Sequence, residues 1–263
     1  MNLGGRSVLL TGATGGIGQA IARALAARGA RLVLTGRRAE VLEPLAAEVG
    51  GRAVACDLAE ASEVSRLLAD VGNADVLVAN AALPGSGALG TFTPEEIDRA
   101  LAVNLRAPMQ LARALSTGME ARGHGHLVFV NSMSGKAASG GGSVYSATKF
   151  GLRGFALGLR EDLRDSGVGV STVFPGFVSD AGMFHESGAK LPAWVATRTP
   201  SQVAGAVLRA IEHNRSEVDV APLGMRLGAA AAGVLPEVAA RLQRRLGSQA
   251  IADEMADGQR DKR

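Results

Sequence analysis

Short apolar runs alternate with longer stretches of helical periodicity from one end of the chain to the other. The apolar runs are rich in valine, leucine and alanine, and they cover residues 7–12, 31–36, 52–56, 75–80, 126–132, 167–174 and 217–222. Continuous apolar runs of this length are typical of parallel strands that are buried on both faces of a sheet. We therefore predict a mostly parallel, seven-stranded sheet.

The segments between these runs place apolar residues at steps of three and four. Three such stripes are Val41, Leu42, Leu45 and Val49; Val64, Leu67, Leu68 and Val71; and Leu152, Phe155, Leu159 and Leu163. This spacing gives a helix one buried stripe. The alternation of strands and helices predicts a doubly wound, Rossmann-like α/β fold with helices on both faces of the sheet.

Capping boxes mark two helix starts. Thr93 and Thr199 each precede a proline and stand three residues before a glutamate or glutamine, a pattern that begins helices. No linker-like segment interrupts the alternation, so we predict one domain over residues 1–250. Residues 251–263 show no clear apolar stripe, and we predict a flexible tail there.

The composition is that of an ordinary globular protein. Hydrophobic residues make up 47% and charged residues 20% of 263 residues, with a formal net charge of +3. Arginines and acidic residues are interspersed, so we expect no nucleic-acid partner. The single cysteine, Cys56, excludes an internal disulfide, favours a reducing compartment and is expected to pack in the core. With no leader and no apolar stretch longer than 227–235, we expect a cytoplasmic protein without an integral membrane segment.

A glycine-rich loop follows the first predicted strand. Gly12, Gly16 and Gly18 lie where this strand gives way to a helix. Glycine lets backbone N–H groups approach a pyrophosphate, whose negative charge is favoured at a helix N-terminus. A merely flexible turn is the simpler explanation, but the position after the first strand favours nucleotide binding.

The second predicted strand ends in Gly36, Arg37 and Arg38, where an acidic residue would hold the ribose hydroxyls of NAD. A guanidinium instead binds a 2′-phosphate through paired, charge-assisted hydrogen bonds. We therefore predict NADP(H) in preference to NAD(H), with Arg37 as the main contact. Two arginines that are simply solvated at a helix start remain the alternative.

The only tyrosine of the chain, Tyr145, stands four residues before Lys149. Residues at this spacing share one face of a helix. A nearby ammonium and a positively charged nicotinamide favour the phenolate, so we expect a lowered pKa for the phenol. Tyr145 could then donate a proton to a carbonyl or remove one from an alcohol. An amphipathic tyrosine beside a surface lysine is the alternative that spacing alone leaves open.

The spacing T-G-x-x-x-G-x-G at residues 11–18, together with Tyr145 and Lys149, resembles the short-chain dehydrogenase/reductase family over roughly residues 5–222. The resemblance implies hydride transfer between a nicotinamide and a carbonyl or alcohol, and a homodimer or homotetramer. It also implies that Ser132, which lies 13 residues before Tyr145, and Asn104 complete the catalytic group. Ser134 ranks second to Ser132.

The same resemblance assigns contacts with the cofactor to residues at the ends of the strands. These are Gly12, Thr14, Gly16, Ile17, Gly18, Arg37, Asp57, Leu58, Asn80, Tyr145, Lys149, Pro175, Gly176 and Val178. Asp57 matches an adenine-contacting aspartate, and N-capping of the next helix is an equally open role. Ala79 and Ala82, on either side of Asn80, depart from the family motif.

Asp180 is a further departure from the family, which generally has threonine there. An ionised carboxylate cannot donate a hydrogen bond, so the neighbouring Ser179 could supply the contact with the carboxamide instead. Pro108, four residues after Asn104, cannot donate to the Asn104 carbonyl and predicts a kink. The freed carbonyl could hold a water that leads to Lys149, or the bend could have no function.

Other features leave more than one role open. His124 and His126 lie in a glycine turn without acidic or cysteine neighbours, so we predict no metal site. Residues 181–199 could form a lid over an apolar substrate or pack against the body or another subunit; they include Met183, Phe184, Leu191 and Trp194. A C-terminal stripe favours core or oligomer packing over contact with a membrane surface; its members are Leu227, Ala231, Val238, Leu242 and Leu246.

The sequence thus predicts an NADP(H)-dependent oxidoreductase with Tyr145 as general acid and base. We expect it to act on an apolar carbonyl or alcohol. A protein that binds NADP(H) as a redox sensor or regulator, without turnover, is the alternative. The short chain beyond the seventh predicted strand disfavours a third class, the sugar-nucleotide epimerases and dehydratases, which need a larger substrate domain.

Overall fold

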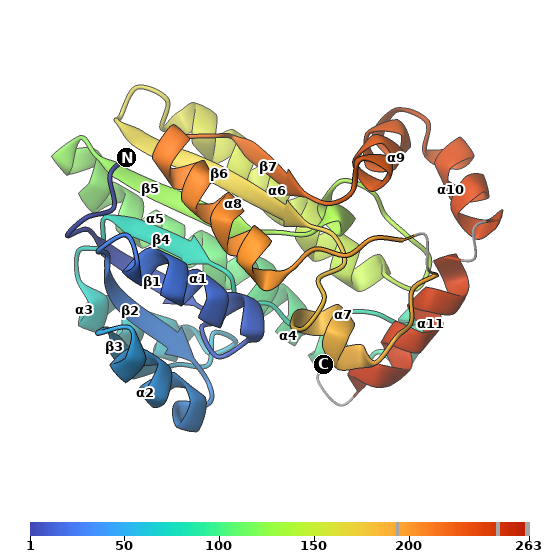
Figure 1. Ribbon diagram of the computed structural model, residues 1–263, viewed down its shortest axis with the longest axis horizontal. Coiled ribbons are helices and arrows are strands. Elements are labelled where there is room, and N and C mark those ends of the chain that lie inside the picture. Colours follow the sequence, from blue (N-terminus) through green and yellow to red (C-terminus); the bar gives the residue numbers. More distant parts are fainter. Residues whose placement is uncertain (193–194, 246–247, 261–263) are drawn as a thin grey trace.

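The computed structural model describes residues 1–192, 195–245 and 248–260, and it contains one sheet with helices on both faces (Figure 1). All neighbouring strands are parallel, in the order β3-β2-β1-β4-β5-β6-β7. The strands are β1 (Ser7–Thr11), β2 (Arg31–Gly36), β3 (Arg52–Ala55), β4 (Val76–Ala79), β5 (Gly125–Val130), β6 (Val168–Pro175) and β7 (Glu217–Val220). Each strand coincides with one of the apolar runs, with β5 and β6 each extending one residue beyond it, so the predicted sheet is confirmed.

The helices follow the strands in the predicted alternation. They are α1 (Gly16–Ala26), α2 (Ala39–Glu48), α3 (Ala61–Val71), α4 (Pro94–Leu101), α5 (Ala107–Arg122), α6 (Ser143–Asp162), α7 (Gly182–Ser187), α8 (Pro200–His213), α9 (Leu223–Val234), α10 (Pro236–Arg245) and α11 (Ser248–Gln259). Three short turns join them: η1 (Leu89–Thr91), the π-helical η2 (Ala102–Arg106) and η3 (Met133–Gly135).

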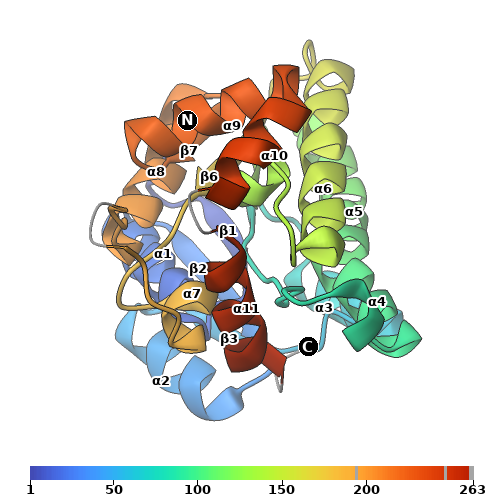
Figure 2. The same cartoon turned by 90° about the vertical axis from the view of Figure 1, so that its right-hand side faces the viewer.

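Successive residues of a strand pack on opposite faces of the sheet, in two separate hydrophobic cores. On β1, Val8 and Leu10 belong to the cluster beneath α1, α2 and α8, whereas Leu9 belongs to the cluster beneath α3, α5 and α6. Figure 2 shows the two helical layers, with α1 and α8 on one side and α5 and α6 on the other. Burial on both faces explains why the strands read as unbroken apolar runs, and the doubly wound fold is confirmed.

The C-terminal segment differs from the flexible tail that we expected. Residues 251–259 belong to α11, which packs against α7. Gln259 is buried, and its Nε2 donates to the Met183 carbonyl over 3.0 Å. The less exposed residues of this segment are Ile251, Ala252, Met255, Ala256 and Gln259, of which only two are large and apolar. Such a face is too weakly apolar to be recognised from periodicity alone.

The stripe expected on the C-terminal helices is not part of the core. Leu227 and Val238 are 62% and 56% exposed, which leaves oligomer or membrane contact as the roles open to them. The side chains of Leu242 and Leu246, like Trp194 of the expected lid, lie outside the described residues.

Both predicted capping boxes are confirmed, and the one at α8 can be tested. The Thr199 hydroxyl accepts from the Gln202 N–H, and the Gln202 side chain accepts from the Thr199 N–H. We expect Thr199→Ala to lower the free energy of unfolding by about 1 kcal/mol, measured by urea denaturation. Ser201→Ala, an exposed position of the same turn, is the control; an equal loss in both variants would contradict the role of the box.

Candidate active site

The loops that follow β1, β2, β4, β5 and β6 meet at the carboxyl edge of the sheet. In a doubly wound fold this edge holds the ligand, where the strand order reverses on either side of the first strand. Here β1 lies between β2 and β4. Most of the residues predicted to bind a cofactor or to take part in catalysis come from these loops or from the first turns of the following helices; Asp57 and Leu58 follow β3, and Asn104 lies in η2 between α4 and α5.

The glycine turn after β1 has a shape that only glycine permits. Gly12 has a φ of 65°, and a Cβ there would lie 2.7 Å from the Ala81 Cα. A Cβ at Gly18 would collide with the Gly12 carbonyl. Gly15, the N-cap of α1, has no side chain to bind the N–H groups of the first turn, which leaves them for an anion. The turn therefore fits the pyrophosphate of a dinucleotide.

Asn80 fixes this turn from the end of β4. Its Nδ2 donates to the carbonyls of Thr11 and Gly12, each over 3.1 Å. In return the Thr11 hydroxyl accepts from the N–H groups of Asn80 and Ala81. Asn80 thus anchors the loop predicted to bind phosphate, and the flanking departures at Ala79 and Ala82 do not prevent these contacts.

The end of β2 carries two exposed arginines. Arg38 donates from Nη2 to the Thr14 carbonyl over 2.8 Å, so its side chain turns back toward the glycine turn. The end of β2 lies so close to the glycine turn that a Cβ on Gly36 would lie 2.8 Å from the Thr14 Cγ2. Arg37 is exposed beside them, and this edge is therefore cationic.

Asp57 does not cap the next helix, so the N-capping alternative is wrong. Helix α3 has Glu60 at its N-cap, whereas Asp57 accepts from the Ala59 N–H at 3.0 Å and from Arg99 at 2.7 Å. Burial raises the pKa of Asp57, but these two hydrogen bonds outweigh it and hold the pKa below its usual value. The following Leu58 packs in the core.

Tyr145 and Lys149 lie one turn apart on α6, as the spacing requires. The Lys149 side chain is buried, its Nζ donates to the Val130 carbonyl over 3.3 Å, and it lies 5.5 Å from the centroid of the Tyr145 ring. Burial lowers the pKa of Lys149 to about 8. The two side chains therefore face one region between β5 and α6.

The groups of the protein itself raise the pKa of the Tyr145 phenol, so the expected lowering is wrong for them. Burial raises the pKa of Tyr145 to about 12, and a hydrogen bond with Ser132 acts in the opposite direction but is weaker. Desolvation penalises the phenolate, an effect that helical spacing cannot reveal. At neutral pH Tyr145 is therefore protonated and can donate its proton.

Ser132 lies at the end of β5 and caps η3. Its Oγ accepts from the Ser134 N–H at 3.1 Å, and the Ser132 hydroxyl acts to lower the pKa of the Tyr145 phenol. Of the two candidate serines, Ser132 is therefore the one that influences the phenol, while Ser134 contributes its backbone to the turn.

Asn131, immediately before Ser132, is a site residue that the sequence analysis missed. It is buried, its Oδ1 accepts from the Ser132 N–H at 2.8 Å, and its Nδ2 donates to the Lys149 carbonyl over 3.0 Å. It thereby ties the predicted catalytic serine to helix α6. The only signal in the sequence was a polar residue at the end of an apolar run.

Asn104 lies in the π-helical η2, where the Ala107 N–H donates to the Ala102 carbonyl. The irregularity predicted at Pro108 therefore takes the form of a π turn, a feature common at functional sites. The buried Asn104 side chain accepts from the Leu83 N–H at 2.7 Å and donates to the Leu83 carbonyl and the Thr148 hydroxyl. It holds the loop after β4 against α6, and a water at its carbonyl stays a prediction.

The loop after β6 carries the remaining predicted cofactor residues. Pro175 ends β6, the Gly176 N–H donates to the Val220 carbonyl, and Val178 is buried. Asp180 adopts a left-handed φ of 61°, and its carboxylate accepts from the Ser179 hydroxyl at 2.7 Å. This bond occupies the hydroxyl proton that we expected Ser179 to offer to a carboxamide.

A short helix follows this loop and lies beside the glycine turn. A Cβ on Gly16 would collide with the Ala181 Cβ, and a Cβ on Gly182 would lie 3.0 Å from Ile17. Ala181 is the N-cap of α7. The predicted cofactor residues Gly16 and Ile17 are therefore packed against the start of α7.

The remaining titratable candidates have structural partners. His124 contacts Asp75 at 3.2 Å, and the buried His126 contacts the Ser171 hydroxyl at 2.8 Å, with its pKa lowered to about 3 mainly by burial. Cys56 packs in the core as predicted, and burial raises its pKa to about 11. Within the described ranges no helix is long and apolar enough to cross a membrane, and no three metal-binding side chains cluster.

The raised phenol pKa is directly measurable, because Tyr145 is the only tyrosine. We expect the near-ultraviolet absorbance of phenolate to stay low up to about pH 11, roughly a unit above the ordinary titration near pH 10. Unfolded protein in urea should titrate near the ordinary value and serves as the control. A native midpoint at or below that of the unfolded chain would contradict the effect of burial.

Comparison with known proteins agrees with this geometry. The family model described as short chain dehydrogenase matches residues 6–192. The ketoacyl reductase HetN of Nostoc sp. (strain PCC 7120) is 38% identical over 227 residues, which cover 83% of this chain and 79% of that protein. The 3-oxoacyl-[acyl-carrier-protein] reductase FabG of Escherichia coli (strain K12) is 32% identical over 184 residues, with 68% and 75% covered.

The fold is also shared with solved structures. A short-chain dehydrogenase from Sphingobium yanoikuyae in complex with NADPH superimposes with a TM-score of 0.77 at 27% identity, over 88% of this chain and 96% of that one. The expected resemblance is therefore confirmed by sequence and by structure. The chain belongs to the short-chain dehydrogenase/reductase family of oxidoreductases.

Proposed function

We propose that the protein is an NADP(H)-dependent oxidoreductase that interconverts a carbonyl and an alcohol, with Tyr145 as general acid and base. The observation that carries this proposal is the placement of Lys149 on α6, with its buried Nζ 5.5 Å from the centroid of the Tyr145 ring; the influence of Ser132 on the pKa of the phenol supports it. When bound, the nicotinamide supplies or accepts the hydride, and the protein's groups orient the substrate and move the proton.

In the direction of reduction, the Ser132 hydroxyl binds the carbonyl oxygen and holds it near the phenol. Tyr145 gives its proton to this oxygen as negative charge develops there. The Lys149 ammonium favours the phenolate that remains, because an opposite charge nearby stabilises the ionised form. The π turn at Asn104 and its expected water would return the proton through Lys149.

For the substrate, we propose an apolar carbonyl compound, with 3-oxoacyl derivatives as the first class to assay. Two relatives carry ketoacyl and 3-oxoacyl reductase in their names. A redox sensor without turnover remains the second candidate, because the Ser179–Asp180 contact departs from the family motif.

We also propose that the protein acts in the cytoplasm as a homodimer or homotetramer. Leu101, Met109, Phe150 and Leu157 of α4, α5 and α6 are each 38% to 43% exposed. Large apolar side chains exposed on neighbouring helices are candidates for subunit contact.

The cofactor preference predicts a selective effect of Arg37→Ala. Hydrogen bonds to charged groups contribute about 1.5–3 kcal/mol, so we expect NADPH affinity to fall by about tenfold or more, with NADH affinity unchanged. Fluorescence titration with each cofactor measures both constants. Arg209→Ala, an exposed arginine on α8, controls for the loss of one positive charge; equal losses for NADPH and NADH in Arg37→Ala would contradict the assignment.

The catalytic assignment predicts that Tyr145→Phe abolishes turnover but spares cofactor binding. Loss of a general acid lowers kcat by about a hundredfold or more. The measurement is NADPH oxidation with a panel of 3-oxoacyl, aliphatic and aromatic carbonyls, together with NADPH titration of both proteins. Retained turnover in the variant would refute the role of Tyr145. A wild-type protein that binds NADPH but reduces no member of the panel would favour the sensor.

A further inference from the structure

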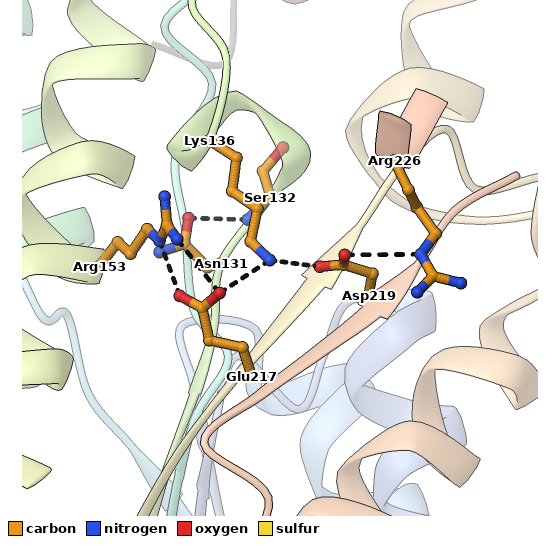
Figure 3. Close-up of polar contacts among 7 residues, drawn as sticks. All are labelled: Asn131, Ser132, Lys136, Arg153, Glu217, Asp219 and Arg226. Atoms are coloured by element: carbon orange, nitrogen blue, oxygen red, sulfur yellow. Dashed lines mark hydrogen bonds and ion pairs between the residues drawn. The ribbon is translucent and has the colours of Figure 1, made fainter. Parts of the chain in front are cut away.

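Five charged side chains form a connected network beside the catalytic serine (Figure 3). They come from the end of η3, from α6, from β7 and from α9. Its members are Lys136, Arg153, Glu217, Asp219 and Arg226. The proposed reaction uses none of them directly, so the network needs a separate explanation.

Glu217 is the one member that joins the two catalytic elements. Its Oε2 contacts the Lys136 Nζ at 2.9 Å, and Lys136 directly follows the η3 turn that Ser132 caps. Its Oε1 and Oε2 also accept from Arg153, over 2.7 and 3.2 Å. Arg153 lies on α6, one helical turn beyond Lys149 and two beyond Tyr145. The carboxylate therefore bridges the turn of Ser132 and the helix of Tyr145.

The η3 turn depends on contacts at its two ends. At the start, Asn131 links Ser132 to the Lys149 carbonyl. At the far end, Lys136 leads to Glu217. η3 has only three residues, and the hydrogen bonds of a 3₁₀ turn have poorer geometry than those of an α-helix, so contacts with neighbouring elements help to fix its position. Both ends are thus tied to α6, one through an amide and one through a carboxylate.

The network is sheltered from water, which makes its ion pairs stronger than pairs on an open surface. The side chains of Lys136, Glu217 and Asp219 are only 14%, 21% and 18% exposed. The ring of Phe174 lies beneath it, with its centroid 4.1 Å from the Lys136 Nζ. Burial raises the pKa of Glu217, but the bonds from Arg153 and Lys136 outweigh it and keep the carboxylate ionised.

We propose that Glu217 is a positioning residue for the reaction: it holds η3 and α6 at the separation at which Ser132 and Tyr145 bind the same substrate oxygen. This inference rests on the proposed function of the two catalytic residues. Glu217 acts through Lys136 and Arg153 and touches neither substrate nor cofactor. Its loss therefore changes the reaction only where Ser132 takes part.

Asp219 provides a contrast within the same network. It binds Lys136 at 2.6 Å, but its other partner is Arg226 of α9 rather than a residue of α6. Asp219 thus holds the turn to β7 without joining it to the catalytic helix. Asp219→Asn is expected to lower kcat less than Glu217→Gln does.

The experiment is a double-mutant cycle of Glu217→Gln with Ser132→Ala. In the wild-type background we expect Glu217→Gln to lower kcat between about tenfold and about a hundredfold, because small misplacements of reacting groups have effects of this size. NADPH affinity is expected to stay unchanged. In the Ser132→Ala background, measured in single turnovers, the same change should alter the rate by less than about twofold.

A remote ion pair gives the matched control. Arg52 and Asp70 pair at 2.7 Å on β3 and α3, at the opposite edge of the sheet. Asp70→Asn is expected to leave kcat unchanged in both backgrounds. Unchanged kcat in Glu217→Gln, or an equal loss with and without Ser132, would overturn the proposal and leave Glu217 a purely structural role.

Two further measurements keep the inference testable if one arm fails. If Glu217→Gln does not fold, Arg153→Lys replaces it, because this change keeps the positive charge but loses the two-point contact with Glu217. The same dependence of the rate on Ser132 is expected.

If the wild-type protein reduces no carbonyl, the proposed function fails. Phenolate absorbance measured immediately after an alkaline pH jump then tests the positioning of Ser132 and Tyr145 alone. The Ser132 hydroxyl lowers the phenol pKa, so both Ser132→Ala and Glu217→Gln should raise the pKa of Tyr145. If Glu217→Gln titrates Tyr145 at the same pH as the wild type, the inference is overturned.

Discussion

The buried amide of Asn131 is the contact on which the geometry of the site depends. It joins the end of β5 to the backbone of α6 at Lys149, and it simultaneously orients the N–H of Ser132. The approach is so close that a Cβ on Gly135 would lie 2.5 Å from the Asn131 Oδ1 and 2.9 Å from the Lys149 carbonyl. A buried amide left without one of these partners would be costly, so strand and helix are held to a single arrangement.

The same closeness explains the electrostatics of the catalytic pair. Packing α6 against β5 buries Lys149 and most of Tyr145, which raises the pKa of the phenol to about 12 and lowers that of the amine to about 8. Both shifts favour the neutral forms and move the two pKa values apart. The proton of the phenol therefore stays on Tyr145 and does not pass to the amine of Lys149.

Sequence reasoning succeeded where the signal was local. Apolar runs buried on both faces identified every strand, and the Tyr145–Lys149 spacing identified one face of α6. It failed where the outcome depended on tertiary contacts. The direction of the Tyr145 pKa, the partners of Asp57 and the tertiary contacts of Asn131 all depend on elements distant in sequence. The helical end of the chain was missed because its less exposed face combines two large apolar residues with alanines and a glutamine.

The contact between α11 and α7 has a consequence for how this chain and its relatives can diverge. Helix α7 begins beside Gly16 and Ile17 of the glycine turn and lies within the span that the family model matches, whereas α11 lies beyond it. Glu254 and Gln259 nevertheless bind the backbone at Lys190 and Met183. Sequence drift in this distal helix can therefore shift α7 against the glycine turn while every predicted catalytic side chain stays the same.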